Sequence, residues 1–118
     1  MVRSARANTG RYATEQEALD AVVGRLVEQL DPHAIWLFGS RARGDHRPDS
    51  DFDLLVVAKP GQAWGEDYVA ALRPAHDTWV GCDVVPCPKQ DFDEALTLRT
   101  SFVADVVETG RRLYEAGA

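Results

Sequence analysis

Two short apolar segments joined by a polar stretch constrain the fold of this chain more than any other feature. Residues 34–38 are all apolar, and the segment 51–58 is apolar on both faces beyond Leu54. Short apolar runs bounded by turn-forming residues are typical of buried β-strands. A strand that is apolar on both faces must be covered on both faces. The sequence therefore predicts a small sheet that contains both segments and is covered on both sides beyond Leu54.

Helices are predicted on either side of these strands in the chain. Thr14 and Glu17 have the spacing of a capping box, and apolar residues then recur with helical spacing as far as Leu30. A short helix is expected to start at Ser40, followed by a polar loop over residues 44–50. A helix is expected at residues 64–77, with Val69 and Leu72 pointing inward and Pro74 bending or ending it. A third strand is expected at residues 80–85, closed by Pro86 and Pro88. One or two helices should follow from residue 91 and stop at Gly110, and Leu113-Tyr114 should form an extended piece.

Length and composition fit a single folded domain. The chain has 118 residues, of which 45% are apolar and 27% are charged, and this is the balance of an ordinary globular unit. Residues 1–13 are interpreted as a flexible N-terminal tail. Residues 14–118 are interpreted as one compact α/β domain.

The overall charge and the cysteines narrow the function classes. Nineteen Asp and Glu against thirteen Lys and Arg give a net charge of −6, which disfavours broad binding to DNA because that affinity rests on neutralised phosphates. No apolar run approaches the roughly 20 residues that span a bilayer, so no membrane span is expected. Cys82 and Cys87 have neither redox-motif nor zinc-ligand spacing, which favours a reduced, cytoplasmic protein.

The triplet Asp51-Phe52-Asp53 is the first candidate for chemistry. Residues i and i+2 of a strand point to the same face, so the two carboxylates converge while Phe52 points to the core. Adjacent carboxylates repel each other and are costly unless a cation lies between them. Their oxygens suit Mg²⁺, which prefers carboxylates, waters and substrate phosphates to a closed protein cage.

Three more residues extend this constellation. Gly39 allows close backbone approach, and Ser40 with the following amides can hold a phosphate at a helix start. Asp83 is the only charge in an otherwise apolar third strand, where a lone carboxylate is costly, so it is expected to face Asp51 and Asp53. Three carboxylates with two Mg²⁺ ions and a nucleoside triphosphate form the arrangement that two-metal phosphoryl or nucleotidyl transfer requires.

The longer stretch around these residues resembles the signature of a known family. It consists of Gly39-Ser40-Arg41-Ala42-Arg43-Gly44 followed by Ser50-Asp51-Phe52-Asp53-Leu54-Leu55-Val56. The chain resembles the minimal nucleotidyltransferase (MNT) family of the DNA polymerase β-like nucleotidyltransferase superfamily over nearly its whole length. The resemblance implies an α/β fold of the α+β type, with a small mixed sheet of three or four strands and helices mainly on one face, the palm-like nucleotidyltransferase architecture.

The resemblance also implies a role for each site residue. Gly39 and Ser40 would hold the triphosphate of ATP, the implied substrate. Asp51 and Asp53 would bind both of two Mg²⁺ ions. Asp83 would bind the catalytic ion and help to deprotonate the attacking hydroxyl.

Structural alternatives stay open for several of these positions. Arg41 and Arg43 would contact phosphates by the resemblance, and a solvated or ion-paired loop is the alternative for both. For Asp83 the alternative is a strand-edge carboxylate bonded to backbone. The triplet at residues 91–93 repeats the Asp-Phe-Asp spelling, but it precedes a helical pattern and is interpreted as helix capping.

Members of the minimal family are typically the partners of HEPN-domain toxins in toxin–antitoxin pairs. The resemblance implies that the MNT protein of such a pair is an enzyme that transfers AMP from ATP to a tyrosine of the toxin. This chain is therefore expected to be a protein adenylyltransferase and antitoxin, as a homodimer or a hetero-oligomer with its toxin. The alternatives are nucleotidyl transfer to a small molecule such as an aminoglycoside, and a non-catalytic subunit that neutralises the toxin by contact.

Overall fold

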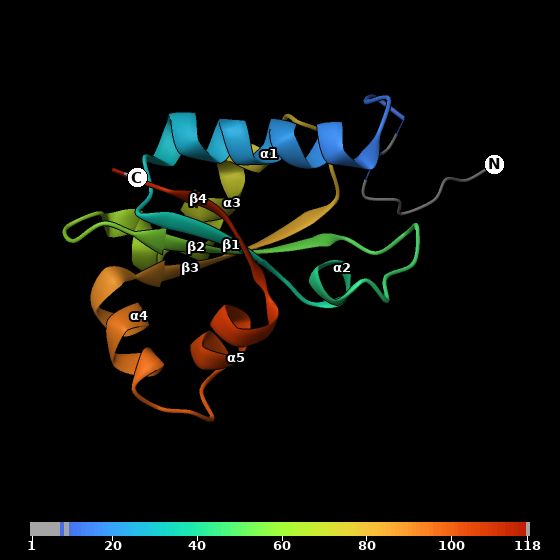
Figure 1. Ribbon diagram of the computed structural model, residues 1–118. Helices are drawn as coiled ribbons and strands as arrows, with labels where there is room; N and C mark the ends of the chain where they lie inside the picture. The colour runs from blue at the N-terminus through green and yellow to red at the C-terminus, as the bar shows by residue number, and fades with distance from the viewer. Residues whose placement is uncertain (1–7, 9, 118) are drawn as a thin grey trace.

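Four strands form one mixed sheet, and helices lie on both sides of it (Figure 1). The structure is a computed structural model that describes residue 8 and residues 10–117. Within this part of the chain, no helix combines the length and the apolar character needed to cross a membrane. In chain order the elements are α1 (Glu15–Leu30), β1 (Ala34–Phe38), α2 (Ser40–Arg43), β2 (Phe52–Ala58), the 3-10 helix η1 (Ala63–Glu66), α3 (Tyr68–His76), β3 (Cys82–Pro88), α4 (Lys89–Leu96), α5 (Phe102–Thr109) and β4 (Arg111–Glu115).

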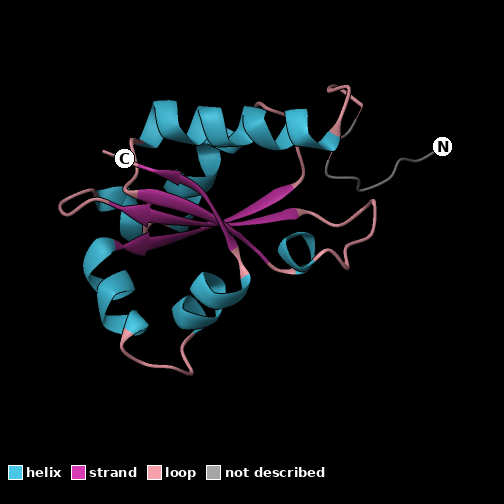
Figure 2. Cartoon of the chain, in the orientation of Figure 1, coloured by secondary structure: helices cyan, strands magenta, loops and turns pink. Residues whose placement is uncertain are grey.

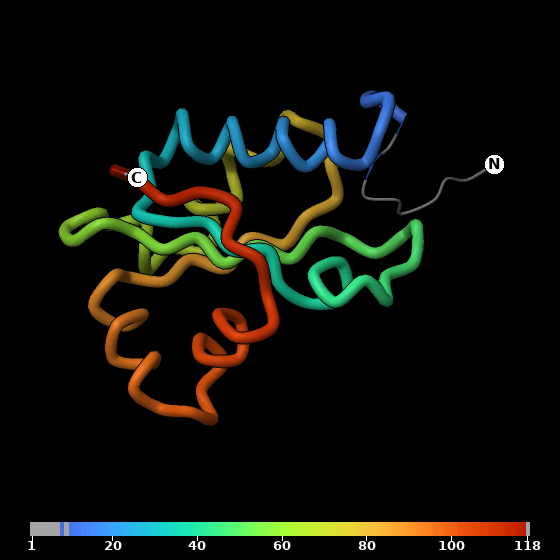
Figure 3. Tube along the Cα trace, in the orientation of Figure 1, coloured from blue at the N-terminus to red at the C-terminus, as the bar shows by residue number. Residues whose placement is uncertain are grey.

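The strands lie in the order β3-β2-β1-β4. β1 is antiparallel to both of its neighbours, whereas β2 and β3 are parallel and are connected through η1 and α3. One end of the sheet therefore contains the last residue of β1 and the first residues of β2 and β3. We call it the α2 end, because α2 and the loop of residues 44–51 lie there (Figure 3).

Each face of the sheet has its own apolar cluster. Figure 2 shows α1 and α3 against one face of the sheet and α4 and α5 against the other. We call the first the α1 face and the second the α5 face. Leu54 and Val56 of β2 pack in the α1-face cluster, and Leu55 and Val57 pack in the α5-face cluster. The predicted mixed α/β sheet is confirmed. The helices, however, cover both faces rather than mainly one, because the apolar side chains of β2 alternate between the faces and both need cover.

The predicted helices at the two ends of the domain are confirmed. Thr14 caps α1, since its Oγ1 accepts a hydrogen bond of 3.0 Å from the backbone N–H of Glu17. The helical pattern that follows residue 91 forms two helices, α4 and α5, and the chain leaves α5 at Gly110. The extended piece predicted at residues 113–114 belongs to β4, which pairs with β1.

The third strand lies further along the chain than its sequence predicts. It was expected at residues 80–85, closed by Pro86 and Pro88, but β3 begins at Cys82 and continues through both prolines, in register with Val56 and Ala58 of β2. β3 is the edge strand of the sheet. A proline is tolerated on an edge because its missing N–H can face away from the neighbouring strand.

The buried side of α3 also differs from the prediction. Val69 was expected to point inward but is 64% exposed, whereas Ala71 and Ala75 are buried. The predicted helix over residues 64–77 is divided into η1 and α3, and α3 begins anew with Asp67 as its cap. Because α3 starts anew after Asp67, the side of the helix that faces the sheet carries Ala71 and Ala75, and Val69 lies on the exposed side.

Part of the expected N-terminal tail is held against the domain. Asn8 forms an isolated β-bridge with Val80, and the hydroxyl of Tyr12 donates a hydrogen bond of 3.0 Å to the carbonyl of Thr78. Fraying was expected for these two residues, but their contacts with the chain before β3 fix them. Residues 1–7 and 9 of the predicted tail lie outside the described residues.

Candidate active site

Two of the three predicted carboxylates lie side by side at the α2 end of the sheet. Asp53 and Asp83 are partners in the parallel register of β2 and β3. Their sequence neighbours Phe52 and Cys82 pack in the α1-face cluster, so the alternation of the strands turns both carboxylates to the α5 face. The prediction that Cys82 is a small core residue on the opposite face is confirmed, and burial raises the pKa of its thiol to about 12.

The charges around Asp53 show that the third predicted carboxylate is also near. The pKa of Asp53 is raised, first by burial and then by the charges of Asp83 and Asp51, while the Arg43 guanidinium lowers it. Asp51 is exposed and precedes the first residue of β2. Asp51 and Asp83 are thus both near enough to Asp53 for their charges to raise its pKa.

These carboxylates fit a divalent cation by their chemistry and charge, because hard oxygen ligands and excess negative charge both favour one. Their present spacing is not that of a closed metal centre. Among the residues that the structure describes, no group of three His, Cys, Asp or Glu side chains is arranged to hold a metal ion. The binding of two Mg²⁺ ions by this set stays a prediction.

Gly39 lies directly against the side chain of Asp53. It directly follows Phe38, the partner of Asp53 in the pairing of β1 with β2. Its backbone has φ 76° and ψ −157°, a region that is essentially restricted to glycine. A Cβ atom at this position would collide with Oδ2 of Asp53. The close contact seen at Gly39 is thus with the side chain of Asp53, and contact of Gly39 with a triphosphate stays a prediction.

Ser40 begins the single turn of α2 that follows. The Gly39 carbonyl accepts hydrogen bonds of 3.1 Å from the N–H groups of Ala42 and Arg43, and the Ser40 carbonyl accepts one of 2.9 Å from Gly44. These bonds hold the turn against the end of β1. Contact of Ser40 with a triphosphate stays a prediction.

The two arginines of α2 have different surroundings. The side chain of Arg41 is 4% exposed and forms an ion pair with Glu15 of α1. Its Nε donates to the Ser50 carbonyl at 2.8 Å, and its guanidinium lies 4.4 Å from the centre of the Phe52 ring, which belongs to the α1 face. The ion-paired alternative therefore describes Arg41. Arg43 is exposed and pairs with Asp45 at 3.3 Å, and its positive charge lowers the pKa of Asp53.

The different surroundings predict different effects of two alanine substitutions. Arg41→Ala should lower the free energy of unfolding by about 2–3 kcal/mol, because it removes a buried stacking contact and leaves two carbonyls and a carboxylate without their donor. Arg43→Ala should change stability by less than about 0.5 kcal/mol, since its ion pair is exposed. Urea denaturation of the two variants measures both values. Equal destabilisation by the two would contradict this assignment.

Tyr68 belongs to the site although no sequence pattern singled it out. Its hydroxyl donates a hydrogen bond to Oδ1 of Asp83, and this bond is the main cause of the raised pKa of Tyr68. The hydrogen bond therefore favours the protonated form of the phenol. The contact joins residues 15 positions apart on α3 and β3, which neither helical nor strand periodicity relates.

An aromatic pair borders the carboxylates on the α5 face. Phe38, the cross-strand partner of Asp53, meets Phe102 of α5 edge to face, with 5.0 Å between ring centres. Phe102 is 49% exposed. The pairing leaves an accessible aromatic surface next to the site.

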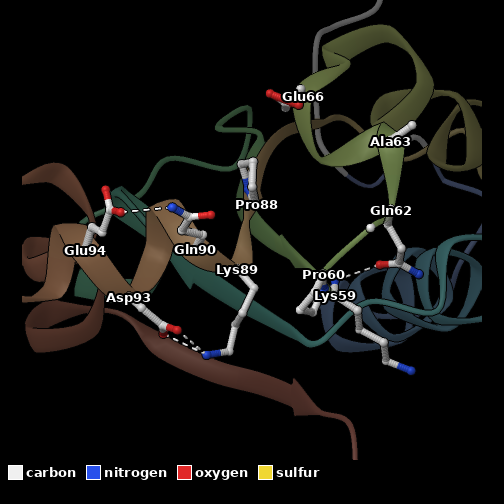
Figure 4. A pocket seen from close by; sticks show the side chains of 11 residues that line it. Lys59, Pro60, Gln62, Ala63, Glu66, Pro88, Lys89, Gln90, Asp93 and Glu94 are labelled. Carbon is white, nitrogen blue, oxygen red and sulfur yellow. Dashed lines mark hydrogen bonds and ion pairs between the residues drawn. The ribbon is translucent and has the colours of Figure 1, made fainter.

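A cavity of about 580 Å³ lies at the opposite end of the sheet (Figure 4). It is lined by residues 59–63 after β2 and by residues around the start of α4. Two pairs of its polar side chains bind each other, Lys89 with Asp93 at 2.6 Å and Gln90 with Glu94 at 3.2 Å. It is therefore separate from the carboxylates, which gather at the α2 end.

Comparison with known proteins finds a similar fold and a matching family model. A crystal structure at 1.40 Å of a "putative nucleotidyltransferase" from Sulfolobus solfataricus has a similar fold, with a TM-score of 0.50 and 20% sequence identity over 92% of this chain and 94% of that one. No curated protein matches the chain by sequence. The family model described as nucleotidyltransferase domain matches residues 19–112, a span that includes every site residue above. The chain therefore belongs to the nucleotidyltransferase domain family.

Proposed function

We propose that this protein transfers AMP from ATP to a hydroxyl group of a protein acceptor, and that the acceptor is a tyrosine of a HEPN-type toxin for which the chain is the antitoxin. The observation that carries the transfer chemistry is the register of Asp53 with Asp83, two carboxylates on one face at the α2 end of the sheet. The toxin partner rests on the resemblance of the Gly-Ser and Asp-x-Asp signature to minimal nucleotidyltransferases.

Asp51, Asp53 and Asp83 are the residues that would hold Mg²⁺. When bound, the metal supplies positive charge to the triphosphate and to the attacking oxygen. The chain's own residues act around that charge. Asp83 accepts the proton of the acceptor hydroxyl, the absence of a side chain at Gly39 leaves space beside Asp53, and Arg43 brings an exposed positive charge to the phosphates.

A protein acceptor is supported by the surface next to the carboxylates. Phe102, at the start of α5, is exposed beside Phe38, the cross-strand partner of Asp53. An accessible apolar surface beside a reactive group can bind a macromolecular partner. The net charge of −6 disfavours a nucleic acid as acceptor.

A transfer assay tests the proposal directly. Purified protein, ATP labelled on its α-phosphate and Mg²⁺ are incubated with host lysate as the acceptor pool. Asp53→Asn serves as the inactive variant and Asp91→Asn as its matched control, because Asp91 belongs to the second Asp-Phe-Asp triplet and is exposed at the start of α4.

The expected result is label on a protein band with the wild type and with Asp91→Asn, and none with Asp53→Asn. Mass spectrometry of that band identifies the acceptor and the modified residue. Label on a small molecule instead would overturn the protein acceptor in favour of a metabolite or drug. No label above the Asp53→Asn background would overturn the transfer activity and favour neutralisation by contact.

A further inference from the structure

The hydroxyl of Tyr68 is within hydrogen-bond reach of the base that the proposed reaction requires. It donates its hydrogen bond to Oδ1 of Asp83, the carboxylate to which the proposed mechanism gives the acceptor proton. A general base must be within hydrogen-bond reach of the proton that it removes. Tyr68 meets this condition from within the chain itself.

The local structure holds Tyr68 in this position while leaving it accessible. It is the first residue of α3, and the side chain of Asp67 caps that helix by accepting a hydrogen bond of 3.0 Å from the N–H of Ala70. Ala71 and Ala75 anchor the helix in the α1-face cluster. The Tyr68 side chain is nevertheless 48% exposed, so a nucleotide on its hydroxyl would extend into solvent rather than into the core.

The other two tyrosines of the chain have different surroundings. The Tyr12 hydroxyl donates to the Thr78 carbonyl, and Tyr114 of β4 packs partly buried against the α1-face cluster. A self-modification directed by the site carboxylates would therefore select Tyr68 over both.

We propose that Tyr68 is an intramolecular acceptor, so that the chain nucleotidylylates its own Tyr68 hydroxyl. This inference rests on the proposed function, because it uses the same carboxylates and the same nucleoside triphosphate. In the step, the Tyr68 oxygen forms a bond to the α-phosphorus, and the bond from that phosphorus to the oxygen bridging to the β-phosphate breaks. Pyrophosphate leaves, and the phenolic proton passes to the Asp83 carboxylate.

Mass spectrometry of the full chain tests this inference without any added acceptor. After incubation with ATP and Mg²⁺, the wild type is expected to gain the mass of one AMP group, located on Tyr68 by fragmentation. Tyr68→Phe should lose the adduct completely, and Tyr114→Phe, the matched control, should keep it. An adduct on any other residue, or none with the wild type, would overturn the inference.

A mixing experiment tests whether the reaction is intramolecular. Tyr68→Phe retains the carboxylates without the acceptor, and Asp53→Asn retains Tyr68 without the complete carboxylate set. Neither chain should be modified when the two are incubated together. Modification of the Asp53→Asn chain in the mixture would show transfer between molecules and overturn the intramolecular step.

Two further measurements separate this inference from the proposed function. Calorimetric titration with a non-hydrolysable ATP analogue measures nucleotide binding by the wild type, and the lysate assay measures its transfer to an external acceptor. If the wild type binds the analogue and labels an external protein while its own Tyr68 stays unmodified, self-modification fails and the proposed function stands. If the wild type neither binds the analogue nor labels any acceptor, both fail.

Discussion

Asp53→Asn is expected to reduce nucleotidyl transfer by about a thousandfold or more while the fold is retained. The carboxylate lies between Asp83 in the neighbouring strand and Asp51 before its own strand, so its removal takes the central ligand from the proposed cation site. Asparagine keeps the size of the side chain and leaves the approach of Gly39 unchanged. Initial rates with labelled ATP measure the loss, and circular dichroism verifies the fold.

The same substitution should make the metal-free protein more stable at neutral pH. Burial and the two neighbouring carboxylates raise the pKa of Asp53 in the folded chain. The unfolded chain therefore loses this proton at lower pH than the folded chain does, and ionisation of Asp53 destabilises the fold as the pH rises past its ordinary value of about 4. Asparagine carries no such cost.

Thermal unfolding in the presence of a chelator measures this difference across pH. The melting temperature of Asp53→Asn should exceed that of the wild type at pH 7, and the gap should close as the pH falls toward 4. A variant that unfolds, or one that retains full transfer, would contradict the assignment of Asp53 as a repelled site carboxylate.

Gly39→Ala is expected to lower both stability and activity. The backbone at Gly39 has a φ and ψ that a side chain strains, and the added methyl group would strike Oδ2 of Asp53. Strain and overlap together should cost about 3 kcal/mol of unfolding free energy. Displacement of the Asp53 carboxylate should reduce the transfer rate by about a hundredfold. Urea denaturation and the labelled-ATP assay give the two values.

Gly61→Ala is the matched control for this substitution. Gly61 also has a positive φ, of 88°, but a Cβ there would meet no atom within 4 Å, and it lies at the far end of β2 from the carboxylates. It should lose about 1–2 kcal/mol of stability with an unchanged transfer rate. If Gly39→Ala behaved no differently from Gly61→Ala, the contact with Asp53 would have no role in catalysis.

Much of this fold could be predicted because short-range patterns specify it. The apolar spacing after Thr14 marks α1, and the two-sided apolar character beyond Leu54 correctly requires cover on both faces of β2. Strand alternation also places the side chains of Asp53 and Phe52 on opposite faces of the sheet, as expected. In each case the relation joins residues a few positions apart, where backbone geometry alone decides which side chains share a face.

The fate of the individual site residues depended on packing between distant segments. Arg41 and Arg43 are equivalent in the signature, yet Arg41 is buried under contacts with Glu15 of α1 and with Phe52, and Arg43 faces the charge of Asp53. A rotation of about two residues along a one-turn helix separates opposite sides of that helix. The position of α1 decides which side of α2 packs against it, and the sequence of α2 alone does not encode that position.

The sequence by itself determined the strands, the capped first helix, and a glycine and an Asp-x-Asp pair at one end of a sheet. The sequence also predicted that Asp83 faces this pair, and the tertiary structure set its exact register with Asp53. Only the tertiary structure decided that Gly39 approaches Asp53 and that Tyr68 binds Asp83. The physical reason is the range of the interactions. Periodicity follows from the geometry of a single helix or strand, whereas register and side-chain contact follow from the packing of several elements at once, which no local pattern encodes.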